Sequence, residues 1–273
     1  MTELTLPQLF AASGTLVLAS LLSLVSALGV HRSLVVAAVR TVAQLLLVGA
    51  VLRWVFVQNT AWVSALIFVV MLGAATLEVG ARQERRLVGA WHALAGGVPV
   101  AAVTTAVVLL ALITVVRPEP LTSPRVAIPL AGIVLGTAMS SASIALNHLF
   151  GSVANERAAL EAQLCLGASA SRAAHGLLVR SLRAGMIPAI NQMAAAGIVS
   201  LPGIMTGQLL AGADPTSAAK YQIALLLLLA GASFFATYGA LRLALHRLFD
   251  DRDRLRLDRL APRAAAPALR TFR

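Results

Sequence analysis

Charged side chains are scarce in this chain of 273 residues. Asp, Glu, Lys and Arg make up 12% of it, and apolar residues make up 59%. Soluble domains carry about 25% charged and about 45–50% apolar residues, so too few charges are present to cover a soluble apolar core. The surplus of apolar side chains must face hydrocarbon. The composition argues against a soluble helical fold and indicates a chain whose solvent is lipid.

Cysteine and phosphate-binding motifs are also missing or nearly so. The single cysteine, Cys165, excludes an internal disulfide and any metal site built from a cysteine cluster. No GxxxxGK(S/T) loop occurs, so this chain cannot hold the phosphates of ATP by that loop. We therefore expect no cofactor on this chain. If ATP drives it, ATP and Mg²⁺ are bound by a separate partner chain.

Positive charge is abundant, with a net charge of +11, but it lies in short loops between apolar blocks. A nucleic-acid interface would need those cations gathered on one folded face, with aromatic residues available for stacking. We expect lipid as a partner and no nucleic acid.

Long apolar runs divide the chain into membrane crossings. A spanning helix needs about 20 mostly apolar residues, and about seven such runs occur. They lie at residues 6–30, 34–57, 61–80, 93–116, 126–150, 186–212 and 221–245. The first run lacks the basic start of a cleavable signal peptide, so we expect it to be kept as a helix. We predict an all-α, multi-pass integral protein of the inner or plasma membrane, with residues 1–273 in one transmembrane domain.

The basic residues orient these crossings, because most of the 22 Lys and Arg residues fall on one side. That side comprises residue 32, residues 82–86, residues 151–184 and the tail at residues 246–273. The opposite loops carry only Arg117, Arg125 and Lys220. Since positive charge stays cytoplasmic, we expect the amino terminus outside and the carboxy terminus inside. We interpret the mixed-charge tail as a solvated or headgroup-touching helix end.

The long polar insert at residues 151–184 is then cytoplasmic. Its sequence predicts two helical pieces broken at Gly167, with Ser169 placed to cap the second piece. Leu160 and Leu164 lie one turn apart on the first piece. A short helix of this kind can dock its apolar anchors in a groove on a soluble partner. The alternative is a connector lying on the bilayer surface.

The spacing inside this insert favours the docking interpretation. Glu161, Ala162 and Gln163, followed after three residues by Gly167, resemble the EAA loop of ABC permeases, the segment that contacts the ATPase subunits. The resemblance implies a coupling role for Glu161, Ala162, Gly167, Arg172 and Arg180.

From Val39 onward the sequence resembles the FetB-type permeases, a family linked to iron export that includes plant relatives associated with aluminium tolerance. Residues 166–222 carry the strongest part of the match, supported by residues 39–56 and 129–139. Thr137 stands where the family pattern usually has asparagine. The resemblance implies that residues 1–273 form a permease domain, with a partner ABC ATPase, a homodimer of permeases and export of a metal ion.

The predicted sixth crossing, residues 186–212, is too long for one straight helix. At 1.5 Å per residue it would measure about 40 Å, against a hydrocarbon core of about 30 Å. Pro202 and Gly203 predict a break, which either lines a transport cavity or is a simple kink packed against neighbours. We expect two pairs of small residues, Gly132 with Gly136 and Gly203 with Gly207, to be close helix contacts. The alternative is direct contact with the substrate.

Polar residues within the apolar runs are costly in lipid, so they are candidates for a substrate path, together with the two residues of the predicted helix break. The candidates are Arg40, Gln44, Glu78, Thr137, Asn191, Pro202, Gly203 and Gln208. Arg40 and Glu78 either pair or extend to the membrane interface. For an iron ion the available ligands near the spans are Glu78 and the thioethers of Met139, Met193 and Met205. Methionine in a helical bundle is more often core filler.

Other functions compete with the iron-export interpretation. The same ABC machinery would serve a sugar nucleotide, a lipid or a peptide, and an ion-coupled secondary transporter would work without a partner. A membrane enzyme such as an intramembrane protease would need a histidine at depth. All five histidines lie at or near predicted helix ends, which argues against such an enzyme.

Overall fold

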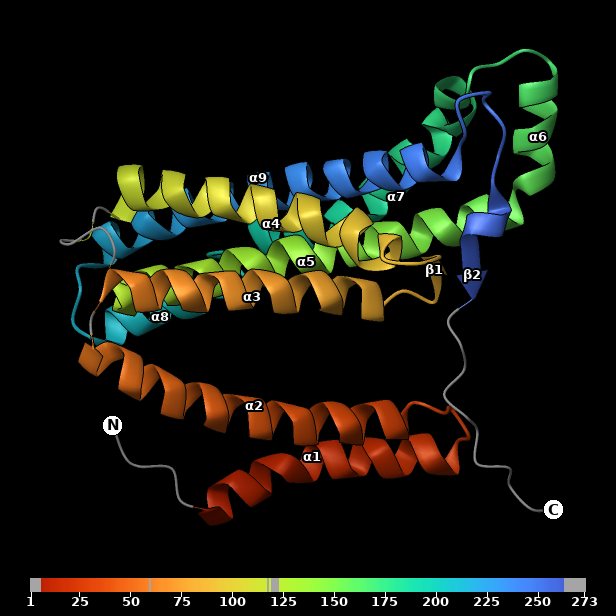
Figure 1. Cartoon of the computed structure of the whole chain (residues 1–273). Helices are drawn as coiled ribbons and strands as arrows, with labels where there is room; N and C mark the ends of the chain where they lie inside the picture. The colour runs from red at the N-terminus through yellow and green to blue at the C-terminus, as the bar shows by residue number, and fades with distance from the viewer. Residues whose placement is uncertain (1–5, 59, 117, 119–122, 263–273) are drawn as a thin grey trace. The chain divides into compact units, whose positions relative to one another are not determined.

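A computed structural model describes residues 6–58, 60–116, 118 and 123–262 of the chain. The chain divides into two compact units, Met1–Asn59 and Thr60–Arg273. Figure 1 labels the helices and strands of both units.

The amino-terminal unit is a pair of helices, α1 (Leu6–Val25) and α2 (His31–Gln58). Gly29 turns the chain between them in left-handed backbone, with φ of 71°. The buried Ser23 hydroxyl accepts a hydrogen bond from the Val30 amide at 3.1 Å and so ties this turn to the end of α1. The two helices correspond to the first two predicted crossings.

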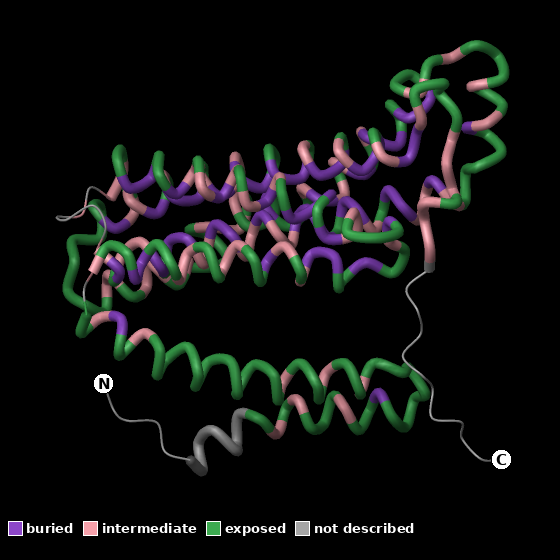
Figure 2. Tube along the Cα trace, viewed as in Figure 1, coloured by how far each residue is buried: buried purple, intermediate pink, exposed green. Residues whose placement is uncertain are grey.

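The carboxy-terminal unit is a helical bundle. Its long helices are α3 (Ala61–Ala81), α4 (Trp91–Ala111), α5 (Pro124–Asn155), α7 (Ala170–Ala195) and α9 (Pro215–Leu248). A π-helical turn, η1 (Leu112–Val116), continues α4, and two short helices, α6 (Arg157–Cys165) and α8 (Gly203–Leu210), flank α7. Buried residues line the facing sides of α4, α5 and α9, where the core lies (Figure 2).

Helix starts in this unit follow local sequence signals. Pro124 and Pro215 occupy the first turns of α5 and α9, where a missing N–H costs no helical hydrogen bond. The Asp214 carboxylate accepts a hydrogen bond from the Ser217 amide at 2.8 Å and caps α9. That bond lowers the pKa of Asp214 below its usual value.

Close helix contacts occur at glycines that the small-residue pattern did not single out. A Cβ placed on Gly185 of α7 would lie 2.7 Å from the Ser141 carbonyl oxygen of α5. Gly96 and Gly97 of α4 leave equally little room against α3. These positions, where no side chain fits, set the helix spacing in the bundle.

The predicted close contacts at Gly136, Gly203 and Gly207 are wrong for the single chain. A Cβ on any of the three would meet nothing within 4 Å, and one on Gly132 would reach only the methyl end of Met71, at 3.5 Å.

Among the described residues, five helices are long and apolar enough to cross a membrane. They are His31–Gln58, Ala61–Ala81, Trp91–Val116, Pro124–Asn155 and Pro215–Leu248. They match the predicted second, third, fourth, fifth and seventh crossings. The first predicted crossing includes only a shorter apolar stretch, Ser13–Val25, and the sixth is not a single helix.

The sixth predicted crossing is divided between α7 and α8, with residues 196–202 between them. Pro202 precedes the first residue of α8, so it does not interrupt a helix. Local hydrogen bonds turn the chain instead: the Gly197 amide donates to the Ser200 carbonyl at 2.9 Å. The predicted break exists, but it begins at Gly197, which adopts a φ of 84°, five residues before Pro202.

The polar insert is shorter than the predicted 151–184. Helix α5 continues to Asn155 and α7 already begins at Ala170, so only α6 and its flanking turns stand apart from the long helices (Figure 1). Arg180 and its neighbours therefore belong to a long bundle helix.

Residues 249–262 of the tail fold back onto the bundle and are not a simple helix end. Strand β2 (Leu260–Pro262) pairs antiparallel with β1 (Arg85–Leu87), which lies in the loop between α3 and α4, and the short helix η2 (Leu257–Arg259) precedes β2. Leu255, Leu257 and Leu260 pack against the apolar core. The alternating leucines of the tail explain this, because charges face water while leucines face the bundle.

Candidate functional site

Two regions of the carboxy-terminal unit carry candidate functional residues. The first is the coupling end, formed by α6, the first turns of α7 and residues 249–262. The second is the α5–α7–α9 pocket, a cavity within the bundle.

At the coupling end, α6 ends in a tight cap that explains the spacing of the EAA-like motif. Gly167 adopts φ 88°, which favours glycine. Its amide donates to the Leu164 carbonyl, and the Ala168 amide donates to the Gln163 carbonyl, both at 3.0 Å. This double hydrogen bond is a Schellman cap, which needs a left-handed residue directly after the helix end. The glycine of the motif is thus a helix stop.

The side chains of α6 divide into an inner and an outer set. Leu160 is buried and Leu164 packs partly against the core, so the two predicted docking anchors are occupied within the chain. Leu166, at the tip of α6, is 88% exposed. The sequence pattern missed Leu166, although its place beside Gly167 puts it at the tip of the turn.

Ion pairs hold α6 to its neighbours. Arg157 donates from Nε to Glu161 at 2.8 Å within α6, and Arg180 of α7 donates from Nη2 to both carboxylate oxygens of Glu156 at 2.7 and 2.8 Å. Both pairs are exposed, so each contributes about 0–1 kcal/mol to stability. Arg180 therefore positions the start of α6, while Arg172 is exposed on α7.

The start of α7 is capped by the tail. Ser169 occupies the predicted capping position, but its side chain makes no capping hydrogen bond. The Asp253 carboxylate accepts from the Ala170 amide at 3.0 Å instead. Nearby, the Arg254 guanidinium pairs with Asp250 at 2.7 Å and lowers the pKa of that carboxyl to about 2. The tail therefore supplies the negative charge that the helix start prefers.

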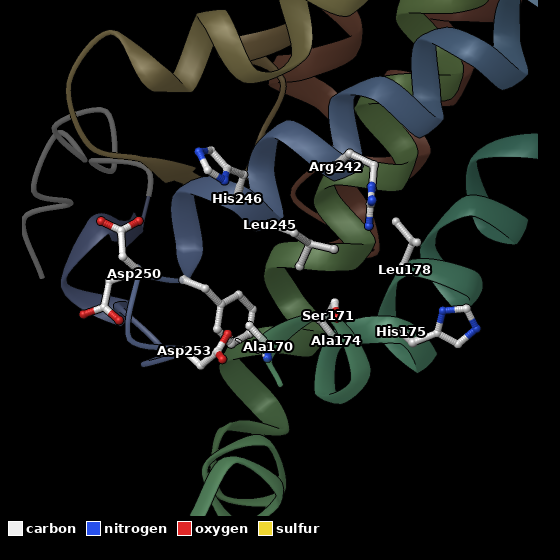
Figure 3. Close-up of a pocket in the computed structure, with 12 residues that line it drawn as sticks. Ala170, Ser171, Ala174, His175, Leu178, Arg242, Leu245, His246, Asp250 and Asp253 are labelled. Carbon is white, nitrogen blue, oxygen red and sulfur yellow. Dashed lines mark hydrogen bonds between the residues drawn. The ribbon is translucent and has the colours of Figure 1, made fainter. Parts of the chain in front are cut away.

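A cavity of about 490 Å³ opens between α7, the end of α9 and the tail (Figure 3). Its wall includes His175, Arg242, His246, Asp250 and Asp253. No group of three or more His, Cys, Asp or Glu residues in the described part of the chain is arranged to hold a metal ion. This cavity is a recess whose wall carries charged groups of both signs.

The α5–α7–α9 pocket has a volume of about 380 Å³ and lies between the middle of α5, the last turns of α7 and the middle of α9. Thr137 and Ser141 of α5, Gln192 and Met193 of α7, and Ser233 of α9 line it. Gly136 also lines it, and the open space beside that glycine belongs to the cavity.

The structure brings only some of the predicted path residues together. Thr137 and Met193 share the α5–α7–α9 pocket, whereas Asn191 is exposed on α7 and Pro202 and Gly203 lie at the start of α8. Gln208 of α8 has a buried Oε1 with no partner among the described residues. The pocket residues Ser141 and Ser233 were not among the predicted path residues, because single serines in apolar helices look like packing residues.

The remaining candidates lie elsewhere. Glu78 of α3 accepts a hydrogen bond from Arg82 Nε at 3.3 Å, and Met139 packs partly against the core. Met205 lies half-buried in α8. Arg40 and Gln44 lie on α2 in the amino-terminal unit. The pairing of Arg40 with Glu78 stays a prediction.

Comparisons with known proteins identify the family. The chain belongs to the family described as Uncharacterised protein family (UPF0014), whose family model matches residues 6–249. The UPF0014 membrane protein slr1647 of Synechocystis is 38% identical over 70% of this chain and 73% of its own length. No solved structure matches the chain.

Two further relatives agree with the resemblance seen in the sequence. The Probable iron export permease protein FetB of Escherichia coli is 29% identical over 88% of this chain and 90% of its own length. Protein ALUMINUM SENSITIVE 3 of Arabidopsis thaliana is 30% identical over 82% of this chain and 80% of its own length. The predicted family is confirmed, and with it a multi-pass membrane protein.

Proposed function

We propose that this member of the UPF0014 family is the membrane-spanning subunit of an ATP-driven ABC transporter that exports iron or a related metal ion. The single observation that carries the coupling part of the proposal is α6, a short capped helix that stands apart from the bundle. The printed name of the Escherichia coli relative supports iron export. ATP and Mg²⁺ are bound by the partner ATPase, and two permease copies form the membrane part.

The surface of α6 is suited to a soluble partner. Glu161 is half-exposed, while Ala162 and Leu166 are exposed. An exposed apolar side chain flanked by charges gives a partner groove both an anchor and a means of discrimination. Leu166 replaces Leu160 and Leu164 as the apolar anchor in this proposal.

Glu161→Arg should lower recovery of the ATPase subunit with the permease by about tenfold, or about 1.4 kcal/mol of binding free energy. The amount of folded permease should not change, because the exposed pair with Arg157 contributes at most about 1 kcal/mol. Gly167→Ala should act in the same direction by straining the turn at φ 88°. Copurification from membranes measures both effects.

Arg157→Ala is the matched control, since it removes the same ion pair and keeps Glu161. It should retain the ATPase. If all of these variants recover as much ATPase as the wild-type protein, α6 is not part of the interface. If Arg157→Ala loses as much ATPase as Glu161→Arg does, the effect comes from loss of the ion pair.

The native Cys165 tests the orientation without any mutation. It is exposed on α6 and is the sole cysteine of the chain. With the carboxy terminus inside, a membrane-impermeant maleimide should label it in inverted vesicles and leave it unlabelled in intact cells. A Cys165→Ala variant with cysteine at Thr122, a position outside the described residues, should give the opposite pattern. Labelling of Cys165 from outside would reverse the topology.

A secondary transporter is the less favoured alternative. Such a transporter needs acidic groups at depth to couple an ion gradient. Glu78 is the one acidic residue within the five spanning helices described above, and it is paired with Arg82. Transport that persists in membranes lacking any ATPase partner would favour this alternative.

A further inference from the structure

The α5–α7–α9 pocket has an unusual lining for a protein that handles metal ions. Its polar groups are the hydroxyls of Thr137, Ser140, Ser141 and Ser233 and the carboxamide of Gln192, together with the Met193 thioether. None of its lining residues is Asp, Glu, His, Cys, Lys or Arg. The pocket therefore offers several hydrogen-bonding groups and no charge.

One of these hydroxyls has no hydrogen-bond partner in the described part of the chain. Ser233 is 1% exposed, and its Oγ has no hydrogen-bond partner among the described residues. An unpaired buried hydroxyl costs about 1–3 kcal/mol, so a group that satisfies it stabilises the site. The Thr137 hydroxyl donates to the backbone of its own helix at 3.0 Å, which leaves its oxygen lone pairs available to an incoming donor.

A bare iron ion suits this lining poorly. Ferrous and ferric ions bind carboxylate, imidazole or thiolate groups, and a cation that leaves water without such ligands loses far more hydration energy than neutral hydroxyls return. The volume points the same way, because water occupies about 30 Å³ per molecule. A space of about 380 Å³ is within the range of small-molecule pockets and is far larger than one ion.

We propose that this pocket binds the cargo as an uncharged, oxygen-rich small molecule, either metal-free or wrapped around a metal as a neutral chelate. The inference rests on the proposed transport function and specifies its substrate class. Hydroxyl and amide groups donate to and accept from the oxygen atoms of such a molecule, while Leu226, Leu229 and Met193 contact its carbon skeleton. In the metal-bound case, the organic ligands of the chelate neutralise the charge of the metal before it reaches the pocket.

Ligand protection of the purified full-length chain tests the proposal without any ATPase. Thermal unfolding is followed with three probes: gallium(III) maltolate as a neutral chelate, glucose as a metal-free polyol, and Mn²⁺ as a bare cation. A ligand that binds the folded state raises the unfolding midpoint, and the rise grows with the logarithm of its concentration above Kd. At least one neutral probe should raise it, and Mn²⁺ should not. Protection by the chelate alone assigns the metal-bound source, and protection by glucose alone assigns the metal-free source.

Two pairs of variants locate the effect. Ser233→Val and Gly136→Leu should weaken apparent affinity for the protecting probe at least tenfold. Ser143→Val should not, although Ser143 is also a buried hydroxyl without a partner, because it does not line the pocket. Gly231→Leu should not either, since the space beside Gly231 is open but lies outside the pocket.

Three results would overturn the proposal: protection by Mn²⁺ that Ser233→Val abolishes, no protection by either neutral probe, or protection unchanged in both pocket variants. Because the partner ATPase is absent, none of these results bears on the copurification test. Loss of ATPase binding to α6 would in turn leave the ligand result standing.

Discussion

Gly185→Leu should remove nearly all of the folded permease, and Gly185→Ala should lower its stability by about 1–3 kcal/mol. A Cβ at this position would lie 2.7 Å from the Ser141 carbonyl oxygen, 2.8 Å from Ala145 Cβ and 3.1 Å from Thr237 Cγ2. These atoms belong to α5 and α9, so the new side chain has no direction in which to move. Relief requires that α7 shift away from both helices.

Gly176 on the same helix provides the control. A Cβ there would meet nothing within 4 Å, so Gly176→Leu should fold normally. Monodisperse protein after detergent extraction, together with the unfolding midpoint, measures both variants. Similar yields and midpoints for Gly185→Leu and Gly176→Leu would show that α7 does not pack against α5 and α9 as described.

Leu87→Asp should detach the tail and raise its sensitivity to trypsin by about a hundredfold. Leu87 is 1% exposed and pairs across the two-stranded sheet with Leu260. Burying a carboxylate there without a partner costs several kcal/mol, and each 1.4 kcal/mol changes the open population about tenfold. Detachment also removes Asp253 from the start of α7.

Val88→Asp is the matched control, because Val88 follows directly in the sequence and is 53% exposed. Its carboxylate stays in water, so cleavage should remain slow. The rate is followed by mass spectrometry of peptides cut at tail arginines, namely Arg252, Arg254, Arg256 and Arg259. Fast cleavage in the wild-type protein would contradict the folded tail.

Much of the bundle could be predicted from composition alone, because spanning helices are fixed by apolar length. Runs such as 93–116 and 221–245 contain the cores of helices that the structure extends by local signals. Helix α7 could not be predicted in this way. It carries Arg172, Arg180 and Arg183 along its first half, so hydropathy placed half of a bundle helix in a polar loop.

The candidate site was only partly predictable, because it depends on which helices meet. The sequence singles out Thr137 as a departure from a family pattern and Met193 as a thioether near a span. Nothing in the sequence places Ser233 opposite them. The spacing of the glycines also gave a wrong prediction. Gly136 was expected at a close helix contact but lies beside open space, whereas the close contact is at Gly185.

Charge pattern alone was also insufficient for the tail. Alternating signs with interspersed leucines predict a solvated helix end as readily as a folded segment. The deciding interactions, β2 on β1 and Asp253 on Ala170, join residues from distant parts of the chain. The sequence of residues 246–262 by itself does not predict either of these interactions.

The pairing of β2 with β1 also fixes an order of events during synthesis. The loop between α3 and α4 leaves the ribosome early, while its partner strand is translated only after α9. At about 5–20 residues per second, the loop waits on the order of ten seconds in an unpaired state. A chain whose translation stops after α9 would still contain every spanning helix, yet its α7 would begin uncapped. The surface formed by α6, the start of α7 and the folded tail is thus completed last, after all the helices of the bundle have been made.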